Sequence, residues 1–370
     1  MQTSLFDFHL PPERIASEPA NPRDSSRMLV VGEEIYDQKI SDLLAHLLAG
    51  DVLVFNDTKV IPARLLGKRG AAKIEILLHK KASLTPRHIC RASSQREREF
   101  LVWQCFAKPA KKLRVGEVVE FADDFKAEVV GKEEDGQVLL KFAESDSEFY
   151  QKLEKYGAMP LPPYIEKIRK AGVQDNKTYQ TVYAKQAGSV AAPTAGLHFT
   201  DELLAKIDAL GVKRVHVTLH VGGGTFLPVK VENTADHKMH SEYAEISAEA
   251  ATAINAARAA GGRVIAVGTT SVRTLESAAD AAGNLKEFAD ETNIFITPSY
   301  KFKIVDMMLT NFHLPKSTLF MLVCAFSGLE KMKLAYAHAI ANNYRFYSYG
   351  DACLLLPTSP PFSRNQCPTV

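Results

Sequence analysis

The chain has 370 residues, of which 46% are hydrophobic and 24% charged, and its formal net charge at pH 7 is +2. This length and composition are those of a soluble globular protein with room for two domains and a sizeable core. No apolar run is long enough to span a bilayer, and five scattered cysteines without C-x-x-C spacing argue against a disulfide framework or a zinc knuckle. Because the N-terminus shows no secretory signal, we expect a cytoplasmic protein with reduced thiols.

The predicted elements begin with a short helix over residues 41–50, with Ser41 as the expected N-cap and Gly50 as the closing glycine. A buried strand follows over residues 51–56 and ends in the polar sequence Asn-Asp-Thr. From about residue 65 to residue 142, short alternating or apolar runs are separated by turn residues, which is the pattern of a small antiparallel barrel or sandwich. The expected strands there are 73–78, 100–106, 117–121, 126–130 and 138–142.

Alternation of helices and strands returns after residue 150 and predicts a mixed or parallel sheet with helices packed on it. The expected elements are a capped helix at 200–211, a strand at 213–221, an alanine-rich helix at 247–260, a strand at 263–268 and a helix from residue 269 on. We therefore predict the α/β class: a mixed-sheet main domain with a small all-β barrel domain inserted into it. The predicted boundaries are 1–64 plus 151–356 for the main domain, 65–150 for the barrel, and 357–370 for a disordered tail.

The charge is unevenly distributed along the chain. Residues 59–114 hold 15 Lys and Arg against three acidic residues, whereas the remainder holds 30 basic and 40 acidic residues. A basic block on an otherwise acidic protein is the pattern expected for a polyanionic partner. A solvated surface with ordinary lysines explains the block equally well, and the block alone does not specify RNA.

Two glycine-rich stretches place a histidine and a threonine beside backbone that carries little side-chain bulk. They are residues 188–200 (GSVAAPTAGLHFT) and 220–228 (HVGGGTFLP). Because glycine has no Cβ, such backbone approaches a ligand closely, so both stretches predict pocket walls for a small polar molecule. On the preceding strand, His216, Thr218 and His220 share one face. A role in the site is favoured for His220, beside the glycines, and simple exposure for His216.

Two familiar kinds of site are not supported by these stretches. The glycines at 222–224 lack the G-x-G-x-x-G spacing and the P-loop lysine, so neither a Rossmann dinucleotide site nor the usual methyltransferase glycine motif is indicated. The histidines at 216, 220, 237 and 240 fit no zinc signature, so we expect no metal.

Three later stretches carry polar residues in patterns that suit binding. Residues 264–276 form a strand, a turn and a helix that Thr269 or Thr270 caps, and Arg273 one turn in is placed to hold a carboxylate or a phosphate. An ordinary cap with a surface arginine is equally compatible. Residues 310–318 set polar side chains around a proline. Residues 344–351 are aromatic and basic, and their rings either stack on bases or pack in the core.

Together these stretches closely resemble the S-adenosylmethionine:tRNA ribosyltransferase-isomerase family of queuosine biosynthesis. More than eight motifs occur in one order between about residues 5 and 352, which makes the resemblance specific. The motifs are 21–30, 54–64, 160–165, 179–183, 188–200, 217–229, 237–242, 267–276, 310–318 and 344–351. The chain departs from the family at Gly223, where alanine is usual, in a long segment at 82–99, and in the tail after Leu356. None of these departures removes a functional group.

The resemblance implies transfer and isomerisation of the ribosyl part of S-adenosylmethionine onto 7-aminomethyl-7-deazaguanine at the wobble position of tRNA. The products are epoxyqueuosine-tRNA, adenine and methionine. S-adenosylmethionine is then a consumed substrate, with no permanently bound cofactor and no metal, and the expected partner is the precursor tRNA. We expect a monomer that does not associate with membranes. An RNA methyltransferase and a non-catalytic RNA-binding module are the alternatives.

The resemblance and the motifs together assign candidate site residues. Histidine suits proton transfer near neutral pH, so the catalytic candidates are His198, His220 and His313, with Asp57 and Glu242 to orient them or to hold ribose hydroxyls. The candidates for binding S-adenosylmethionine or the base are Thr194, Gly196, Gly222, Gly223, Gly224, Thr225, Thr269, Thr270, Arg273, Glu276 and Asn311. The candidates for binding tRNA are Arg64, Lys68, Arg69, Lys111, Lys112, Tyr344, Arg345 and Tyr347.

Overall fold

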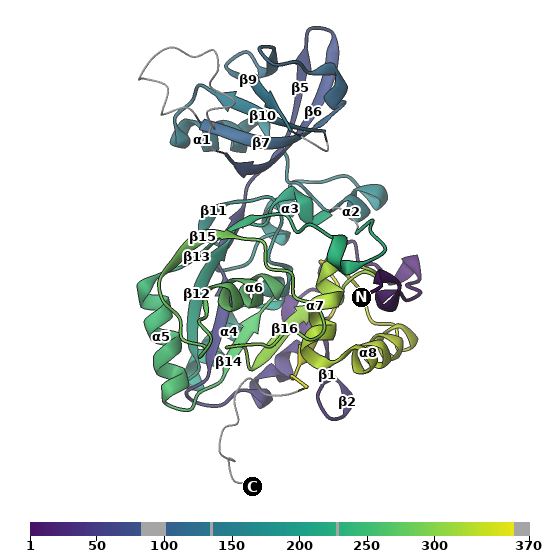
Figure 1. Cartoon of the computed structure of the whole chain (residues 1–370), viewed down its shortest axis with the longest axis vertical. Helices are drawn as coiled ribbons and strands as arrows, with labels where there is room; N and C mark the ends of the chain where they lie inside the picture. The colour runs from purple at the N-terminus through teal and green to yellow at the C-terminus, as the bar shows by residue number, and fades with distance from the viewer. Residues whose placement is uncertain (83–100, 134–135, 227–228, 359–370) are drawn as a thin grey trace.

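A mixed β-sheet forms the centre of the larger part of the molecule (Figure 1). The computed structural model describes residues 1–82, 101–133, 136–226 and 229–358, and within them the sheet has the strand order β15-β13-β12-β3-β14-β16-β17-β1-β2. β12, β3, β14 and β16 are parallel neighbours, β1 is parallel to β17, and the remaining pairs are antiparallel. The strands are β1 (Arg27–Val31), β2 (Ile35–Lys39), β3 (Val52–Asn56), β12 (Lys213–Leu219), β13 (Glu242–Ile246), β14 (Val264–Val267), β15 (Phe288–Thr292), β16 (Met307–Asn311) and β17 (Ala352–Leu355).

Helices cover both faces of this sheet and enclose two apolar cores. The first core packs side chains of α5 (Ala248–Ala259), α6 (Thr269–Ala278), α7 (Thr318–Ser327) and α8 (Leu329–Ala341) against one face. The second packs α4 (Asp201–Ala209) and the 3-10 segments η4 (Ile40–His46) and η8 (Thr194–His198) against the other. The layered arrangement follows from the alternation of helices and strands along the chain.

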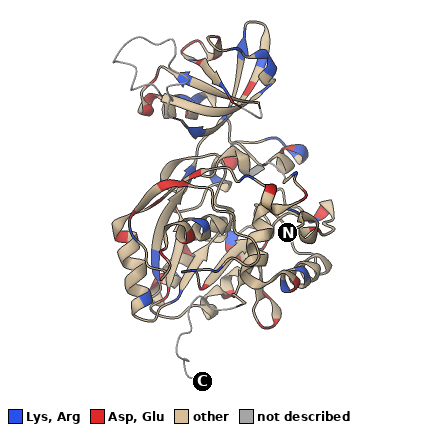
Figure 2. Cartoon of the chain, viewed as in Figure 1, with Lys and Arg blue, Asp and Glu red and all other residues tan. Residues whose placement is uncertain are grey.

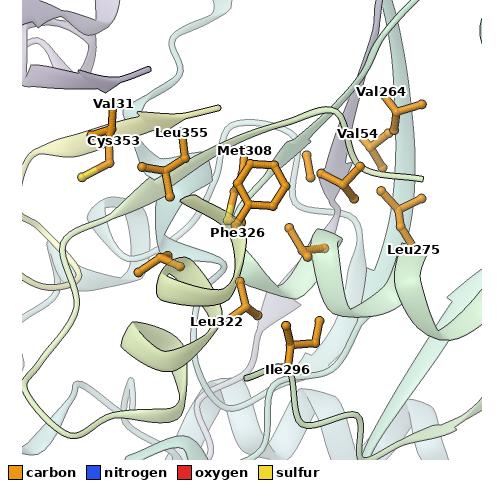
Figure 3. Packing of buried hydrophobic residues seen from close by; sticks show 14 of the residues in the cluster. Val31, Val54, Val264, Leu275, Ile296, Met308, Leu322, Phe326, Cys353 and Leu355 are labelled. Carbon is orange, nitrogen blue, oxygen red and sulfur yellow. The ribbon is translucent and has the colours of Figure 1, made fainter. Parts of the chain in front are cut away.

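Strand β3 shows how the sequence supplies both cores at once. Val52 and Val54 belong to the first core, and Leu53 and Phe55 belong to the second. Successive side chains of a strand point to opposite faces, so a continuous apolar run is the pattern of a strand covered on both sides. Figure 3 shows the first core, with Val54 lying among side chains from neighbouring strands and helices.

The strands between residues 64 and 142 close into a barrel that lies at one end of the molecule (Figure 1). Its order is β10-β7-β6-β5-β8-β9, and Trp103, Phe125 and Phe142 are fully buried in its core. α1 (Asp146–Tyr156) begins with a capping box between Ser145 and Glu148, and its Phe149 packs into the same core. The strands are β5 (Arg64–Arg69), β6 (Ala72–Lys81), β7 (Leu101–Lys108), β8 (Val118–Ala122), β9 (Phe125–Lys132) and β10 (Gln137–Phe142).

Short elements connect the sheet to the barrel and to the N-terminal segment. β4 and β11 pair in parallel, and α2 and α3 lie in the connection that returns from the barrel. These elements are β4 (Thr58–Val60), α2 (Pro163–Ile168), α3 (Asp175–Thr178), β11 (Gln186–Ser189), η1 (Thr3–Phe6), η2 (Pro12–Arg14), η3 (Arg23–Ser25), η6 (Ala110–Lys112), η9 (Gly223–Phe226) and η10 (Thr234–Asp236).

The predicted fold class, a mixed-sheet α/β protein with an inserted β-barrel, is confirmed. The predicted strands and helices correspond to β3, β6 to β10, β12, β14, α4, α5 and α6, within a few residues at each end. The boundaries proposed for the domains remain predictions. The segment at 83–99 and the tail beyond residue 358 lie outside the described residues.

The predicted caps of two helices are wrong. The helix predicted at residues 41–50 is a 3-10 helix over Ile40–His46 with Lys39 at its N-cap and Leu47 at its C-cap, so Ser41 lies inside it and Gly50 does not close it. Neither Thr269 nor Thr270 caps α6, because Gly268 occupies the N-cap with φ of 89° and no side chain accepts a hydrogen bond there. That positive φ favours glycine, so the backbone and not a hydroxyl defines this turn.

The described parts of the chain show no membrane-spanning helix, no metal cluster and no disulfide. In those parts, helices lack the length and apolar character needed to cross a membrane. No three His, Cys, Asp or Glu side chains of the described residues stand together as ligands for a metal ion. Cys105, Cys324 and Cys353 are buried free thiols.

Candidate active site

The site residues gather where four parallel strands end at one edge of the sheet. β12, β3, β14 and β16 are neighbours, and each is followed at once by a polar stretch singled out in the sequence. Asp57 follows β3, His220 follows β12, Thr269 follows β14 and His313 follows β16. In open α/β sheets, ligands bind at the carboxyl ends of the strands, so this edge is the candidate site.

His198 is held rigidly at this edge by hydrogen bonds to both ring nitrogens. Its Nδ1 lies 2.7 Å from Ser26 Oγ, and its Nε2 lies 3.1 Å from Asn311 Nδ2. Thr194 fixes the asparagine in turn by donating its hydroxyl to Asn311 Oδ1 at 2.9 Å. Burial lowers the pKa of His198 to about 4, so the imidazole is neutral at pH 7. Gly196 is required here because a Cβ would lie 2.0 Å from the Tyr183 hydroxyl.

His220 keeps one ring nitrogen available. Its Nδ1 lies 2.8 Å from Thr58 Oγ1, while Nε2 has no hydrogen-bond partner among the described residues. The ring stacks on Tyr243 with centroids 6.1 Å apart, and it rests against Gly188, where a Cβ would lie 2.9 Å from the ring. Burial lowers the pKa of His220 to about 4. A neutral imidazole that is oriented through one nitrogen and free at the other has the geometry of a general base.

His313, which follows the end of β16, is buried like His198. Its Nε2 lies 3.1 Å from Thr310 Oγ1, and its backbone N–H donates to the Tyr336 hydroxyl at 2.9 Å. Burial lowers the pKa of His313 to about 3. Asp57 is also buried and accepts a hydrogen bond of 2.7 Å from Thr218 Oγ1.

The glycine loop at 222–224 packs between the sheet and the barrel. Gly222 N–H donates to Glu242 Oε1 at 3.0 Å, and the other carboxylate oxygen of Glu242 accepts from Arg273 Nη1. A Cβ on Gly222 would lie 2.4 Å from the ring of His79 in the barrel, and one on Gly224 would lie 2.7 Å from His240. The loop is therefore glycine-rich because two imidazoles pack directly on its backbone.

Sequence reasoning missed His79 and gave His240 no role in the site. The two rings meet edge to face with centroids 6.0 Å apart, and burial lowers the pKa of His79 to about 4. No local signal points to His79, which lies in an apolar strand about 140 residues before the glycine loop.

The two remaining candidates of the glycine loop are Gly223 and Thr225. Gly223 approaches only the side chains of Phe106 and Leu77 in the barrel, and the side chain of Thr225 lies outside the described residues.

Two charged residues of α6 have different roles: Arg273 lies at the site edge, and Glu276 holds a neighbouring loop in place. Arg273 is 5% exposed and bonds Glu242, and Thr269 and Thr270 lie in the first turn. Both oxygens of Glu276, by contrast, accept hydrogen bonds from the loop at 300–305: from the Tyr300 hydroxyl and from the backbone N–H groups of Lys303, Ile304 and Val305. Glu276 therefore anchors that loop, and its oxygens are already engaged within the chain. Burial raises the pKa of Glu276.

An open surface depression of about 650 Å³ lies beside the C-terminal half of α6, against β15 and the loop that follows it. The lining residues are Glu276, Ser277, Phe288, Glu291, Thr292, Asn293, Ile294, Tyr300, Lys301 and Lys303.

The basic candidates on the barrel differ in their availability. Figure 2 shows Lys and Arg spread over the barrel. Lys68, Lys111 and Lys112 are exposed. Arg64 bonds Glu75 and Glu166 at 3.1 and 2.6 Å, and Arg69 bonds Glu117 at 2.6 Å, so these two guanidinium groups are already paired.

The aromatic candidates near the C-terminus are largely occupied by the protein itself. Tyr344 is fully buried and donates its hydroxyl to Asp37, so its ring is not presented to a base. Arg345 bonds Asp351, and Phe346 is buried, as the core alternative predicted. Tyr347 is partly buried, adopts a φ of 77° and packs edge to face on Tyr164, with ring centroids 4.0 Å apart.

Fold and site together define an α/β enzyme whose site lies at the carboxyl edge of a mixed sheet, next to a β-barrel. Over residues 3–355 the chain matches the family model described as queuosine biosynthesis protein, and it belongs to that family.

Similar proteins carry one enzyme name. The S-adenosylmethionine:tRNA ribosyltransferase-isomerase of Parvibaculum lavamentivorans is 53% identical over 366 residues, which cover 97% of this chain and 100% of the relative. The protein of the same name in Rhodospirillum rubrum is 52% identical over 362 residues, with 98% and 100% covered. A crystal structure of S-adenosylmethionine tRNA ribosyltransferase from Thermotoga maritima is similar with a TM-score of 0.53 and 35% identity, over 95% of this chain and 100% of that chain.

Proposed function

We propose that this protein is an S-adenosylmethionine:tRNA ribosyltransferase-isomerase. It transfers the ribosyl moiety of S-adenosylmethionine to the amine of 7-aminomethyl-7-deazaguanine at the wobble position of tRNA and isomerises it to give epoxyqueuosine. Adenine and methionine leave. One observation carries the proposal: two relatives of that name are 53% and 52% identical to this chain over 97% and 98% of its length.

The chemistry requires groups that move protons at three places. The sulfonium acidifies the neighbouring ribose C5′ protons, the departing adenine needs a proton, and the attacking amine must lose one. His220 fits the role of base best, because Thr58 orients its Nδ1 while Nε2 remains available. Its pKa of about 4 keeps the ring neutral and able to accept a proton at pH 7.

His198 and His313 fit a supporting role as hydrogen-bonding groups. Both ring nitrogens of His198 already lie beside Ser26 and Asn311. Asn311, the last residue of β16, bonds both Thr194 and His198 of η8 and so links these two elements at the site. Asp57, fixed by Thr218, is placed to accept a ribose hydroxyl. The free N–H groups of the first turn of α6 favour an anionic part of the substrate.

The tRNA approaches across the barrel in this proposal. The exposed lysines Lys68, Lys111 and Lys112 supply positive charge for phosphates. The wobble base leaves the anticodon stack to reach the sheet edge, as bases do for enzymes that modify them.

The test uses purified protein, S-adenosylmethionine labelled in adenine, and tRNA carrying the deazaguanine precursor at the wobble position. We expect release of free adenine and a mass gain on that nucleoside that corresponds to the ribosyl-derived group. S-adenosylhomocysteine with a gain of one methyl group would instead identify an RNA methyltransferase. Tight tRNA binding without turnover of S-adenosylmethionine would identify a binding module.

A further inference from the structure

Buried polar atoms without partners occur on both sides of the glycine loop. In the described part of the chain, Arg273 Nε and Nη2, Thr270 Oγ1 and His79 Nδ1 are buried and have no hydrogen-bond partner. Buried polar groups are nearly always paired in folded proteins, so unpaired ones at a site edge call for an explanation. A bound ligand that supplies the missing hydrogen-bond partners would explain these unpaired atoms.

Arg273 presents a complete edge of its guanidinium. The side chain is 93% buried, and only Nη1 is used, by Glu242. Nε and Nη2 form the other edge, whose two parallel donors match the two oxygens of a carboxylate. Thr270 lies three residues earlier on α6, on the same side of the helix, so its hydroxyl is placed near that edge.

His79 reaches the same place from the barrel. The pairing of β6 with β7 shifts register between Leu78 and Lys80, which makes His79 the extra residue of a β-bulge. Bulges re-aim side chains and occur often beside active sites. The His79 ring packs on Gly222, and Gly222 N–H bonds the carboxylate that holds Arg273. The pKa of His79, lowered by burial to about 4, leaves one nitrogen with a lone pair at pH 7.

We propose that these atoms form a subsite for the α-amino-acid head of S-adenosylmethionine, shared between the α/β part and the barrel. The free edge of Arg273 binds the carboxylate, Thr270 donates to it, and His79 Nδ1 accepts a hydrogen bond from the ammonium group. Glu242 orients Arg273 and adds negative charge near the ammonium. This inference rests on the proposed function, because it assumes that S-adenosylmethionine is the small substrate.

The depression beside α6 adjoins this subsite. Glu276 and Ser277 in its lining lie one helical turn beyond Arg273, and Thr292 in its lining is the cross-strand partner of Glu242. The head group therefore has an open depression of about 650 Å³ next to it, which gives it a path from solvent, and the ribose extends from it towards Asp57 and His220 at the sheet edge.

The test compares three ligands by calorimetry without tRNA: S-adenosylmethionine, its decarboxylated analogue, and the analogue in which hydroxyl replaces the amine. Wild-type protein should prefer S-adenosylmethionine to both analogues. Arg273→Gln should weaken binding of S-adenosylmethionine by about 10- to 100-fold and leave binding of the decarboxylated analogue nearly unchanged, since only the former loses a charged contact. Arg273→Lys, which keeps the charge without the fork, should lose most of the same preference.

His79 has its own pair of variants. His79→Leu should reduce the preference for the amine over the hydroxyl analogue to the part that the charge of Glu242 supplies, and His79→Asn, which places a polar atom near the position of Nδ1, should restore part of the loss. Arg214→Gln is the matched control, because Arg214 pairs with Asp208 at the opposite end of β12, and it should bind all three ligands like wild type.

The outcomes separate the two proposals. Equal loss of affinity for S-adenosylmethionine and its decarboxylated analogue in both Arg273 variants would overturn the carboxylate contact. An unchanged amine preference in His79→Leu would overturn the contribution of the barrel. If wild-type protein binds none of the three ligands alone, the same titrations are made with the tRNA present. Absence of adenine release from S-adenosylmethionine with the precursor tRNA would overturn the proposed function instead.

Discussion

At the scale of single residues, three histidines of the site share a depressed pKa but differ in what surrounds their ring nitrogens. Burial keeps all three neutral at pH 7. His198 is bonded at both nitrogens, and His313 lies among core side chains next to Tyr336. His220 and His313 each combine an orienting hydroxyl, from Thr58 and Thr310, with a second nitrogen that has no partner in the described residues. His220 is only partly buried whereas His313 is buried, so access to the ring, and not the pKa, distinguishes His220 as the candidate base.

His220→Gln should lower the rate of adenine release by about 10²- to 10⁴-fold without unfolding the protein, which is the usual contribution of a positioned acid or base. In wild type, the pKa of His220 is about 4, so the ring stays neutral over most of the range. Protonation of His220 should therefore lower the rate of adenine release only as the pH drops towards 4, and should not change that rate near neutrality. Single-turnover assays over pH 4.5–8 measure both effects. A wild-type rate in the variant would remove His220 from the mechanism.

At the scale of elements, the sequence predicts the strands well because each strand carries its own alternation or apolar run. The polar residues at the ends of β3, β12, β14 and β16 can be predicted from the sequence for the same reason. The side chains that contact these residues cannot be predicted, because they come from distant parts of the chain. Glu276 resembles a ligand-binding residue until the loop at 300–305 is seen to occupy both its oxygens. His79 carries no signal because only the folded barrel brings it to Gly222.

The glycine loop offers a matched pair of substitutions that differ by one position. Gly222→Ala would place a Cβ 2.4 Å from the His79 ring, whereas Gly223→Ala would meet only side chains of Phe106 and Leu77 at 3.3 to 3.4 Å. We expect Gly222→Ala to push His79 away and to weaken S-adenosylmethionine binding at least tenfold. Gly223→Ala should behave like wild type. Calorimetric titration measures both, and equal affinities for the two variants would show that the contact between loop and barrel does not shape the site.

At the scale of the whole molecule, the buried histidines make folding depend on pH. Their pKa values lie at about 3 to 4 in the folded state against the ordinary value of 6.5, so between pH 6.5 and about 4 the unfolded chain binds more protons. The free energy of unfolding must then fall as the pH falls through this window. A fully buried histidine such as His198 contributes a slope of about 1.4 kcal/mol per pH unit.

Urea unfolding at several pH values between 4.5 and 7 measures that slope. His198→Asn should flatten the dependence relative to wild type, because the variant has no group to protonate at this position. The control His9→Asn changes a histidine that is exposed and should keep the wild-type slope. If the wild-type stability were constant across the window, the buried imidazoles would not be neutral in the folded state.

The distribution of charge over the molecule leads to the last prediction, which concerns tRNA. Lys111 and Lys112 are exposed on the barrel, in the basic block, and Lys206 and Lys213 are equally exposed on α4 and β12. Each phosphate contact releases counterions, so loss of one lowers the slope of log affinity against log salt by about one. Lys111→Gln with Lys112→Gln should weaken tRNA binding and reduce that slope by up to about two. Lys206→Gln with Lys213→Gln, which removes the same net charge from the α/β part, should leave the slope unchanged. Filter binding between 50 and 300 mM salt distinguishes them, and equal slopes in both double variants would mean that the tRNA does not lie along this side of the barrel.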